Sequence, residues 1–337
     1  MNFSWSENAS TAHTATFCSS AVNKSLVPTA ASSDSTLLVW QYLAALLSLL
    51  GTVSNLFVLI VVLRQPALRA GAGIFVAHLL LCHLALCSVT FPVIIYYINR
   101  AYRLFDIDCG ACRYRHVLHV AFNNLVSWSD ALLAMNRIVA VFFPIHYRYI
   151  IRKSVQFLAL ALIWLNATWL ALFPTLDYLA SYKPTPLGTC FLAIRNSTFR
   201  IMFSITFTLP LVLMGLAAFS VLGKLAWVRR SRRTVVAAWP AAVHATVMSE
   251  RQTRASLMML GCFAVSLVSQ VASLVQPLIV ISVRYPALSI YLWLLSWIQY
   301  SFTPIIFLAL NKDYRNGAKL FFSSGTIPSR TSRHSRW

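Results

Sequence analysis

Charged side chains are scarce in this chain of 337 residues: they make up 11% of it, and only 8 residues are Asp or Glu. Hydrophobic residues make up 58%, which is too apolar for an ordinary water-soluble domain and is typical of membrane proteins. The net charge of +20 does not indicate nucleic-acid binding. The basic residues stand in short clusters between apolar runs, and no nucleic-acid-binding module is recognisable.

The sequence patterns of enzymes are also lacking. It contains no metal-ligand spacing, no glycine-rich phosphate loop and no Ser/His/Asp set that stands out. The neighbouring histidines His116 and His119 are too few for a zinc site, which needs three or four ligands. We therefore expect no enzyme activity, no cofactor and no bound metal.

Residues 1–36 lack the apolar core of a cleavable signal peptide, and none is expected. They are rich in Ser, Thr and Ala, and they hold three glycosylation sequons, at Asn2, Asn8 and Asn23. We predict a disordered, glycosylated, extracellular arm. The alternative is that the sequons arise by chance, as they often do in Ser/Thr-rich sequence.

Seven long apolar segments follow the arm, and each is long enough to cross a hydrocarbon core of about 30 Å. They are expected to be helices, because a backbone in lipid must satisfy its own hydrogen bonds and barrel strands would alternate in polarity. The fold class is therefore an all-α, seven-transmembrane helix bundle. The segments are 37–63, 74–98, 112–142, 155–179, 199–227, 252–282 and 287–310.

The distribution of basic residues predicts the orientation of the bundle. With the N-terminus outside, 19 of the 28 Lys and Arg residues fall on the inner side and 9 on the outer side. Such an excess places the C-terminus in the cytoplasm. Residues 311–322 are predicted to form a short amphipathic helix in the membrane interface, and residues 323–337 a disordered cytoplasmic tail.

Several segments carry recognisable marks in register. The first contains "GTVSNLFVLIVVL" around Asn55, the third contains "NRI" with Arg137, and the seventh contains "TPIIF". Cys112 stands at the outer end of the third segment, and the remaining marks are Trp164, Pro174 and Pro210. Over residues 37–322 the chain thereby resembles a rhodopsin-like G-protein-coupled receptor.

The resemblance implies a receptor in the plasma membrane that binds an extracellular ligand and signals through a heterotrimeric G protein. Arrestin and membrane lipid are the further partners expected. One rival is a non-signalling seven-helix decoy or trafficking protein. A transporter or channel is disfavoured, because the sequence shows neither a repeat pair nor broken helices.

The departures from the family pattern predict atypical activation, with weak agonist efficacy or unusual coupling. Asn136 replaces the family's Asp beside the arginine, Ala218 replaces a tyrosine, and the sixth segment lacks the Cys-Trp-x-Pro motif. Glu250 could instead hold Arg137 and close the inner end, or could simply offset nearby arginines. The predicted coupling and switch residues are Asn136, Arg137, Glu250, Thr303, Pro304 and Phe307.

An inner polar network of Asn55, His83 and Asp130 is also predicted. His83 stands where the family has its ion-binding Asp, whereas Asp130 lies two turns outward of Arg137. Because a buried charge must find a partner or water, we predict an ion pair between His83 and Asp130. The alternative is that each is solvated separately.

The candidate ligand site lies along the outer half of the third and seventh segments. His119 stands where amine receptors of the family carry Asp, which disfavours a monoamine, and the nearby arginines favour an anionic group on the ligand. Snorkelling to lipid phosphates and ordinary aromatic packing are the alternatives. The candidate ligand-binding residues are Arg115, His116, His119, Asn123, Gln276, Trp293 and Trp297.

Four cysteines fall outside the segments, where disulfides persist, and they allow three connectivities. We favour Cys112–Cys190, which would tie the top of the third segment to the second outer loop. Cys18–Cys109 is then the weaker remaining prediction.

Overall fold

The computed structural model describes residues 34–69, 71–104, 109–176, 179–184, 190–235, 257–258, 260–272 and 286–323. The predicted arm with Asn2, Asn8 and Asn23, the tail, Glu250 and Gln276 lie outside these residues. The elements are α2 (Asp34–Arg64), α3 (Pro66–Arg69), α4 (Gly73–Ala85), the π-helix η3 (Leu86–Thr90), α5 (Phe91–Leu104), α6 (Cys109–Phe142), α7 (Pro144–Ile150), α8 (Lys153–Leu172), the 3-10 turn η4 (Phe173–Leu176), β1 (Ala180–Pro184), β2 (Cys190–Ile194), α9 (Ser197–Val235), α11 (Pro286–Leu310) and α12 (Lys312–Ser323).

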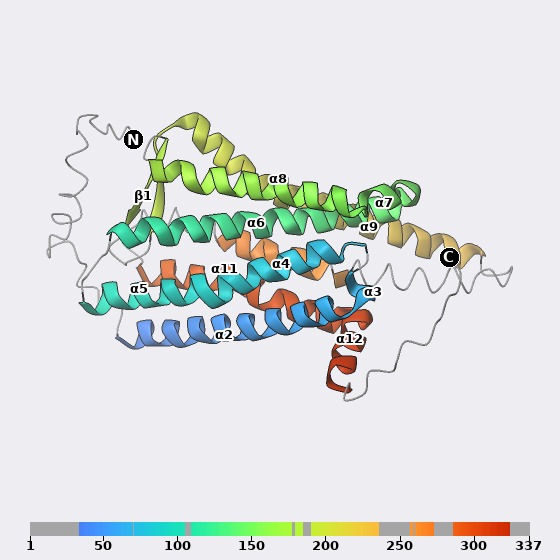
Figure 1. Cartoon of the computed structure of the whole chain (residues 1–337), viewed down its shortest axis with the longest axis horizontal. Helices are drawn as coiled ribbons and strands as arrows, with labels where there is room; N and C mark the ends of the chain where they lie inside the picture. Colours follow the sequence, from blue (N-terminus) through green and yellow to red (C-terminus); the bar gives the residue numbers. More distant parts are fainter. Residues whose placement is uncertain are drawn as a thin grey trace.

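Six helices among the described residues are long and apolar enough to cross a membrane, and a shorter apolar helix covers Leu260–Ala272. This shorter piece, helix six below, lies within the predicted segment 252–282, whose remainder is outside the described residues. The long helices run along one direction, with the β1–β2 hairpin at one end and α12 at the other (Figure 1). These two ends are called the disulfide end and the α12 end.

The second span changes its winding at η3, where Leu86–Thr90 forms a π-turn between α4 and α5. Pro92 follows directly and has no amide hydrogen to donate to the preceding turn, so the α-helical ladder is interrupted here. The hydroxyl of Ser88 donates to the carbonyl of Leu84 at 2.7 Å. The local change in winding rotates the outer part of the span, which includes Val89 and Thr90.

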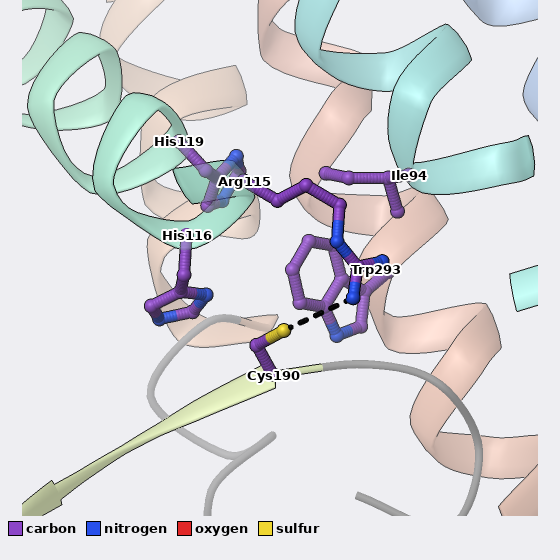
Figure 2. A pocket seen from close by; sticks show the side chains of 6 residues that line it. All are labelled: Ile94, Arg115, His116, His119, Cys190 and Trp293. Carbon is purple, nitrogen blue, oxygen red and sulfur yellow. Dashed lines mark hydrogen bonds between the residues drawn. The ribbon is translucent and has the colours of Figure 1, made fainter. Parts of the chain in front are cut away.

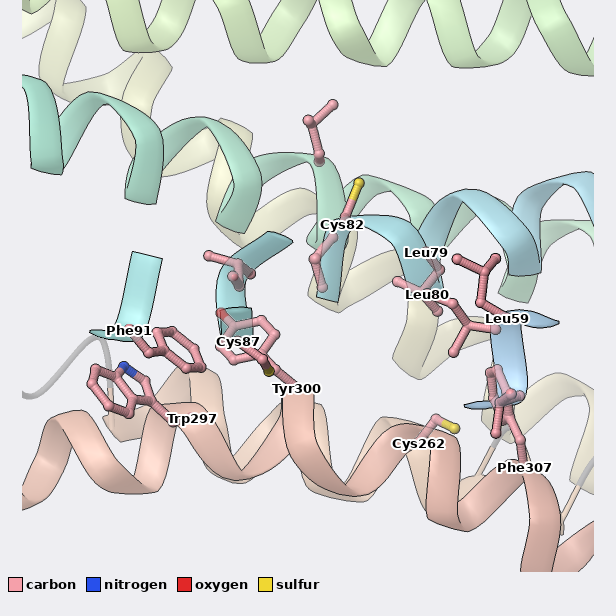
Figure 3. Close-up of a cluster of buried hydrophobic side chains, with 14 of the residues drawn as sticks. Leu59, Leu79, Leu80, Cys82, Cys87, Phe91, Cys262, Trp297, Tyr300 and Phe307 are labelled. Carbon is pink, nitrogen blue, oxygen red and sulfur yellow. The ribbon is translucent and has the colours of Figure 1, made fainter. Parts of the chain in front are cut away.

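The core of the bundle forms around α11. In the most apolar stretch of 18 residues, 56% of the residues of α11 are buried, compared with 33% of those of α2. The ring of Trp297 stacks on Phe91 with centroids 3.9 Å apart, at one end of the cluster in Figure 3. Trp40 donates to the carbonyl of Ile290 at 2.7 Å. At Gly51 the helices come so close that a Cβ would collide with the Cys87 sulfur, which is why only glycine fits there.

The helix α12 packs on α2 at the α12 end of the bundle. Tyr314 is buried, and the guanidinium of Arg64 lies 4.9 Å from the centre of the Phe321 ring. Leu320 is 56% exposed, so this apolar side chain faces the surroundings of the bundle. The charged side chains Lys312 and Arg315 are exposed as well, as expected for a helix at a membrane interface.

Candidate functional site

A small cavity lies at the disulfide end, where α5, α6, α11 and β2 meet (Figure 2). Its volume is about 10 Å³. Since a cavity of that size holds about one water molecule, this conformation is closed to a larger ligand. The lining side chains are Ile94, Arg115, His116, His119, Cys190 and Trp293.

The guanidinium of Arg115 is fixed in place from two sides. Its Nη2 donates to the Cys190 sulfur at 3.3 Å, and its Cζ lies 4.1 Å from the centre of the Tyr97 ring. The disulfide Cys112–Cys190, with Cα atoms 5.7 Å apart, holds β2 against α6 and confirms the favoured pairing. Arg115 is only 9% exposed, so the cavity contains a preorganised, permanently positive group.

Two histidines complete the polar side of this cavity. The ring of His119 lies 5.1 Å from Trp293, and that of His116 lies 5.0 Å from Tyr182. Burial raises the pKa of Tyr182, whose hydroxyl donates to the Ala171 carbonyl at 3.1 Å and stays neutral. None of the described lining residues is a carboxylate. The site therefore offers cationic and hydrogen-bonding groups suited to an anion.

Two predicted ligand residues lie away from this cavity. Trp297 is fully buried and stacks on Phe91, so its ring contributes to helix packing in this conformation, and its role in ligand binding stays a prediction. The side-chain amide oxygen Oδ1 of Asn123 accepts a hydrogen bond from the Tyr300 hydroxyl at 2.6 Å, deeper in the bundle. Gln276 lies outside the described residues.

The predicted inner network divides into separate contacts. The amide nitrogen of Asn55 donates to the carbonyls of Gly51 and Tyr300 at 2.7 and 2.9 Å, and so ties α2 to α11. Asn55 is completely buried, as a helix-linking amide should be. These contacts involve neither His83 nor Asp130.

The predicted ion pair between His83 and Asp130 is wrong. The carboxylate Oδ2 of Asp130 accepts a hydrogen bond from the Gln299 amide at 2.8 Å. The His83 ring packs edge-on against Tyr300, 5.4 Å between centroids, and its nitrogens have no hydrogen-bond partner among the described residues. A neutral amide from α11 reaches the carboxylate and stabilises it without burying a second charge, which is the less costly solution in a bundle core.

Sequence reasoning missed the polar contacts that α6, helix six and α11 make with one another in the middle of the bundle. Ser127 accepts a hydrogen bond from the Gln270 amide at 3.1 Å, and Ser269 donates to the Ser296 carbonyl at 2.7 Å. With Gln299 these contacts connect α6, helix six and α11, and are called the polar belt. Their spacing could have indicated this arrangement, because residues 123, 127 and 130 and residues 296, 299 and 303 each recur every three or four positions.

The predicted switch residues lie near the α12 end. Asn136 is buried, and its amide atoms have no hydrogen-bond partner among the described residues, whereas Arg137 is half-buried. Phe307 packs on Tyr314 with ring centroids 5.6 Å apart. Burial raises the pKa of Tyr314 to about 12, although the nearby charge of Arg137 acts to lower it.

The seventh helix carries the other two switch residues. The hydroxyl of Thr303 donates to the Gln299 carbonyl at 2.7 Å, within α11. Pro304 is buried one residue further along. The proposed lock between Arg137 and Glu250 cannot be placed, because Glu250 lies outside the described residues.

Comparison with known proteins decides the family. The family model described as "7 transmembrane receptor (rhodopsin family)" matches residues 54–307. The chain belongs to this family. Human galanin receptor type 2 is 28% identical over 180 residues, a match covering 52% of this chain and 45% of that receptor, so the chain spans about half the length of this relative. The crystal structure of squid rhodopsin has a TM-score of 0.70 at 15% identity, and covers 89% of each chain.

The family assignment confirms the predicted fold class and the predicted rhodopsin-like resemblance. The chain is a seven-transmembrane receptor of the plasma membrane, and because its family is one of receptors, it is not an enzyme. Within this receptor, the cavity beside the disulfide and the polar belt below it lie on the same helices, α6 and α11.

Proposed function

We propose that the receptor binds an extracellular ligand with an anionic group at the disulfide-end cavity, and that it signals through a heterotrimeric G protein at its α12 end. In this orientation the N-terminus is outside and the C-terminus is cytoplasmic. The observation that carries the proposal is Arg115, a buried cation pinned by Cys190 and Tyr97. His119 at the neighbouring turn provides no counter-ion for a monoamine.

Ligand binding requires the cavity to open, because its 10 Å³ are too small for any ligand beyond a few atoms. The ring contact between His119 and Trp293 joins α6 to α11 across the cavity, and a ligand that separates them changes the packing of both helices. Such a ligand shifts the population only if it binds the opened arrangement more tightly than the closed one. Arg115 attracts the anionic group in both the closed and the opened arrangement. The difference in affinity between the two arrangements therefore comes from the apolar remainder of the ligand.

Two features support atypical activation. Phe307 cannot donate the hydrogen bond that a tyrosine at this position would offer, and its ring packs on Tyr314 instead. Ala218 is 1% exposed in a close-packed contact of α6 and α9 with Ala131 and Ala134. A tyrosine at 218 has no room in that contact, so the close packing of α6 on α9 excludes the hydroxyl that the family's tyrosine would supply. Because both hydroxyls are missing, we expect weak agonist efficacy. Arrestin and membrane lipid are the further partners we expect for this receptor.

The ligand class is tested by screening anionic, cationic and neutral compounds on surface-expressed receptor, with G-protein dissociation as the readout. For an active anionic compound, Arg115→Gln should raise the half-maximal concentration about tenfold or more, since a hydrogen bond to a charged group is worth roughly 1.5–3 kcal/mol. Arg195→Gln is the matched control, because Arg195 is exposed on the same side of the bundle. Anionic agonists that act equally on the Arg115→Gln receptor would rule out the proposed ligand site.

Signalling competence is tested separately, in the absence of any ligand. Basal G-protein dissociation should change with Arg137→Ala, and it should increase with Phe307→Tyr, which adds a single hydroxyl. Restoring Phe307→Tyr together with Ala218→Tyr tests the same idea less cleanly, since the second change must open the contact of α6 with α9. If surface-expressed protein gives no response to any of these changes, the non-signalling decoy or trafficking protein is the better description.

A further inference from the structure

A second hollow lies on the outside of the bundle, between α5 and α6 near the disulfide end. Its volume is about 280 Å³, close to the lower limit of roughly 300 Å³ for small-molecule sites. Its apolar wall is formed by Val89, Val93 and Leu118, which are 53, 37 and 47% exposed. Exposed apolar side chains on two membrane spans face hydrocarbon, so the hollow, called the α5–α6 groove, opens to the acyl chains of the bilayer.

The head of this groove is polar and positive. Arg115 and Tyr97 lie there, with the guanidinium 4.1 Å from the centre of the phenol ring. Arg115 stands three residues inside the end of its span, Cys112–Phe142, or about 4.5 Å by the rise of an α-helix. That depth is the level of lipid headgroups and of the first chain carbons. The groove therefore combines an apolar trough with one fixed cation at the depth where an amphiphile carries its headgroup.

The shape of the groove follows from the π-turn η3. Val89 and Thr90 belong to this turn and line the groove, and the interruption before Pro92 sets the direction in which they point. From Tyr97 to Val89 the wall runs over eight residues, or about 12 Å, which is under half of a hydrocarbon core of about 30 Å. A single chain in one leaflet fits this length, and π-turns of this kind are frequent at functional sites.

We propose that the α5–α6 groove binds a long-chain fatty-acid carboxylate from the bilayer, with its headgroup on Arg115 and its chain along Val93 and Leu118. The charge selects this class, because Arg115 is the single cation among the described lining residues and matches one monoanion. A phosphate monoester, with a charge near −2, would require a second cation. The limited volume favours one chain over the two chains of a phospholipid.

This site is distinct from the disulfide-end cavity, although Arg115 belongs to the lining of both. Val93 and Leu118 line only the groove, whereas His119 and Trp293 line only the cavity. Substitutions at Val93 and Leu118 therefore test the groove without changing the proposed ligand site. An occupied groove would also hold Arg115 from the membrane side, which gives membrane lipid a route to influence the cavity.

The experiment uses full-length receptor in phosphatidylcholine nanodiscs and palmitic acid that carries a photoactivatable diazirine in its chain. After irradiation, mass spectrometry locates the labelled residues, and unlabelled palmitate is added as competitor. Labelling is expected within residues 89–93 and at Leu118. It should fall in Val93→Trp and Leu118→Trp, which fill the groove. The matched control is Leu162→Trp, because Leu162 is also an exposed apolar residue of a membrane span, at 58%, but lies on α8.

Recognition of the carboxylate is tested in the same nanodiscs. Arg115→Gln should weaken labelling about tenfold or more, as for the loss of a hydrogen bond to a charged group. Palmitic acid methyl ester and a single-chain phosphate monoester should compete poorly. Equal labelling of wild type, Val93→Trp and Leu118→Trp would overturn the site, and equal or better competition by the methyl ester or the phosphate would overturn the carboxylate assignment. Neither result would affect the proposed ligand cavity.

Discussion

The hydrogen bond between Gln299 and Asp130 gives the sharpest test of how this bundle is held together. Both side chains are buried, at 1 and 6% exposure, and the amide nitrogen lies 2.8 Å from the carboxylate oxygen. The change Gln299→Leu keeps the volume and removes the donor. A hydrogen bond to a charged group contributes about 1.5–3 kcal/mol, and the carboxylate that remains is less well solvated.

A second contribution to the free energy of unfolding opposes the loss of this hydrogen bond. The amide oxygen of Gln299 has no hydrogen-bond partner among the described residues, so replacing it with a methyl group returns about 1 kcal/mol. We therefore expect Gln299→Leu to destabilise the folded receptor by about 2 kcal/mol, which corresponds to roughly 5 °C in the unfolding midpoint. The assay is thermal unfolding of detergent-solubilised receptor, followed by tryptophan fluorescence at one fixed scan rate because unfolding of such proteins is often irreversible.

The double variant separates a specific contact from general damage. Asp130→Leu alone leaves the Gln299 amide without its acceptor and should also destabilise the folded receptor. The double variant Asp130→Leu with Gln299→Leu removes both partners. It should be about 1.5 kcal/mol more stable than the sum of the two single effects predicts. Gln41→Leu is the control, since the Gln41 amide nitrogen has no partner among the described residues. Combined with Asp130→Leu, it should behave additively. Additivity within about 0.5 kcal/mol for the Asp130–Gln299 pair would refute the reasoning.

Two further changes test the packing and the crosslink. Gly51→Ala should lower the unfolding midpoint, because its Cβ collides with the Cys87 sulfur, and adding Cys87→Ala should restore much of the loss. Gly223→Ala is the control and should be neutral or slightly stabilising, because a Cβ there meets nothing within 4 Å. An equal effect at both glycines would contradict the close approach at Gly51. Cys112→Ser should reduce surface expression as much as the double variant Cys112→Ser with Cys190→Ser, since the single change already opens the crosslink. The two cysteines are 78 residues apart, and in the chain-entropy account such a crosslink is worth about 4 kcal/mol. Additive losses would contradict the pairing.

The helices were predictable because their composition leaves the backbone little choice. Apart from the sixth, of which only part is described, the spans extend the predicted segments by a few residues. The fourth is the exception, because it turns into a 3-10 helix at Phe173 and ends at Leu176 before the predicted 179. Pro174 causes this, because it cannot continue the α-helical ladder. The fifth helix runs on to Val235, since basic residues at its inner end favour water and still form good helix.

The partners of buried polar groups were less predictable. Helical spacing correctly placed Asp130 on an interior stripe, but several neutral and charged groups lie at similar depth, and the spacing does not show which one is nearest. His83 was the obvious counter-charge, whereas the neutral amide of Gln299 makes the contact. Trp297 shows the same limit for aromatic residues, because its stacking on Phe91 depends on the rotation of two helices.

The polar belt has consequences for how this receptor can change shape. Among the described residues, the hydrogen bonds that join helix six to its neighbours include those from Gln270 to Ser127 and from Ser269 to the Ser296 carbonyl, both between neutral groups. Such bonds between membrane helices average about 0.6 kcal/mol each, so outward movement of helix six breaks little. The charge-assisted bond from Gln299 to Asp130 joins α6 to α11 and does not involve helix six. Among the described residues, the amide-to-carboxylate contact therefore joins α6 to α11, and helix six is held by neutral hydrogen bonds, so we expect a displacement of helix six to cost less free energy than a separation of α6 from α11 at this depth.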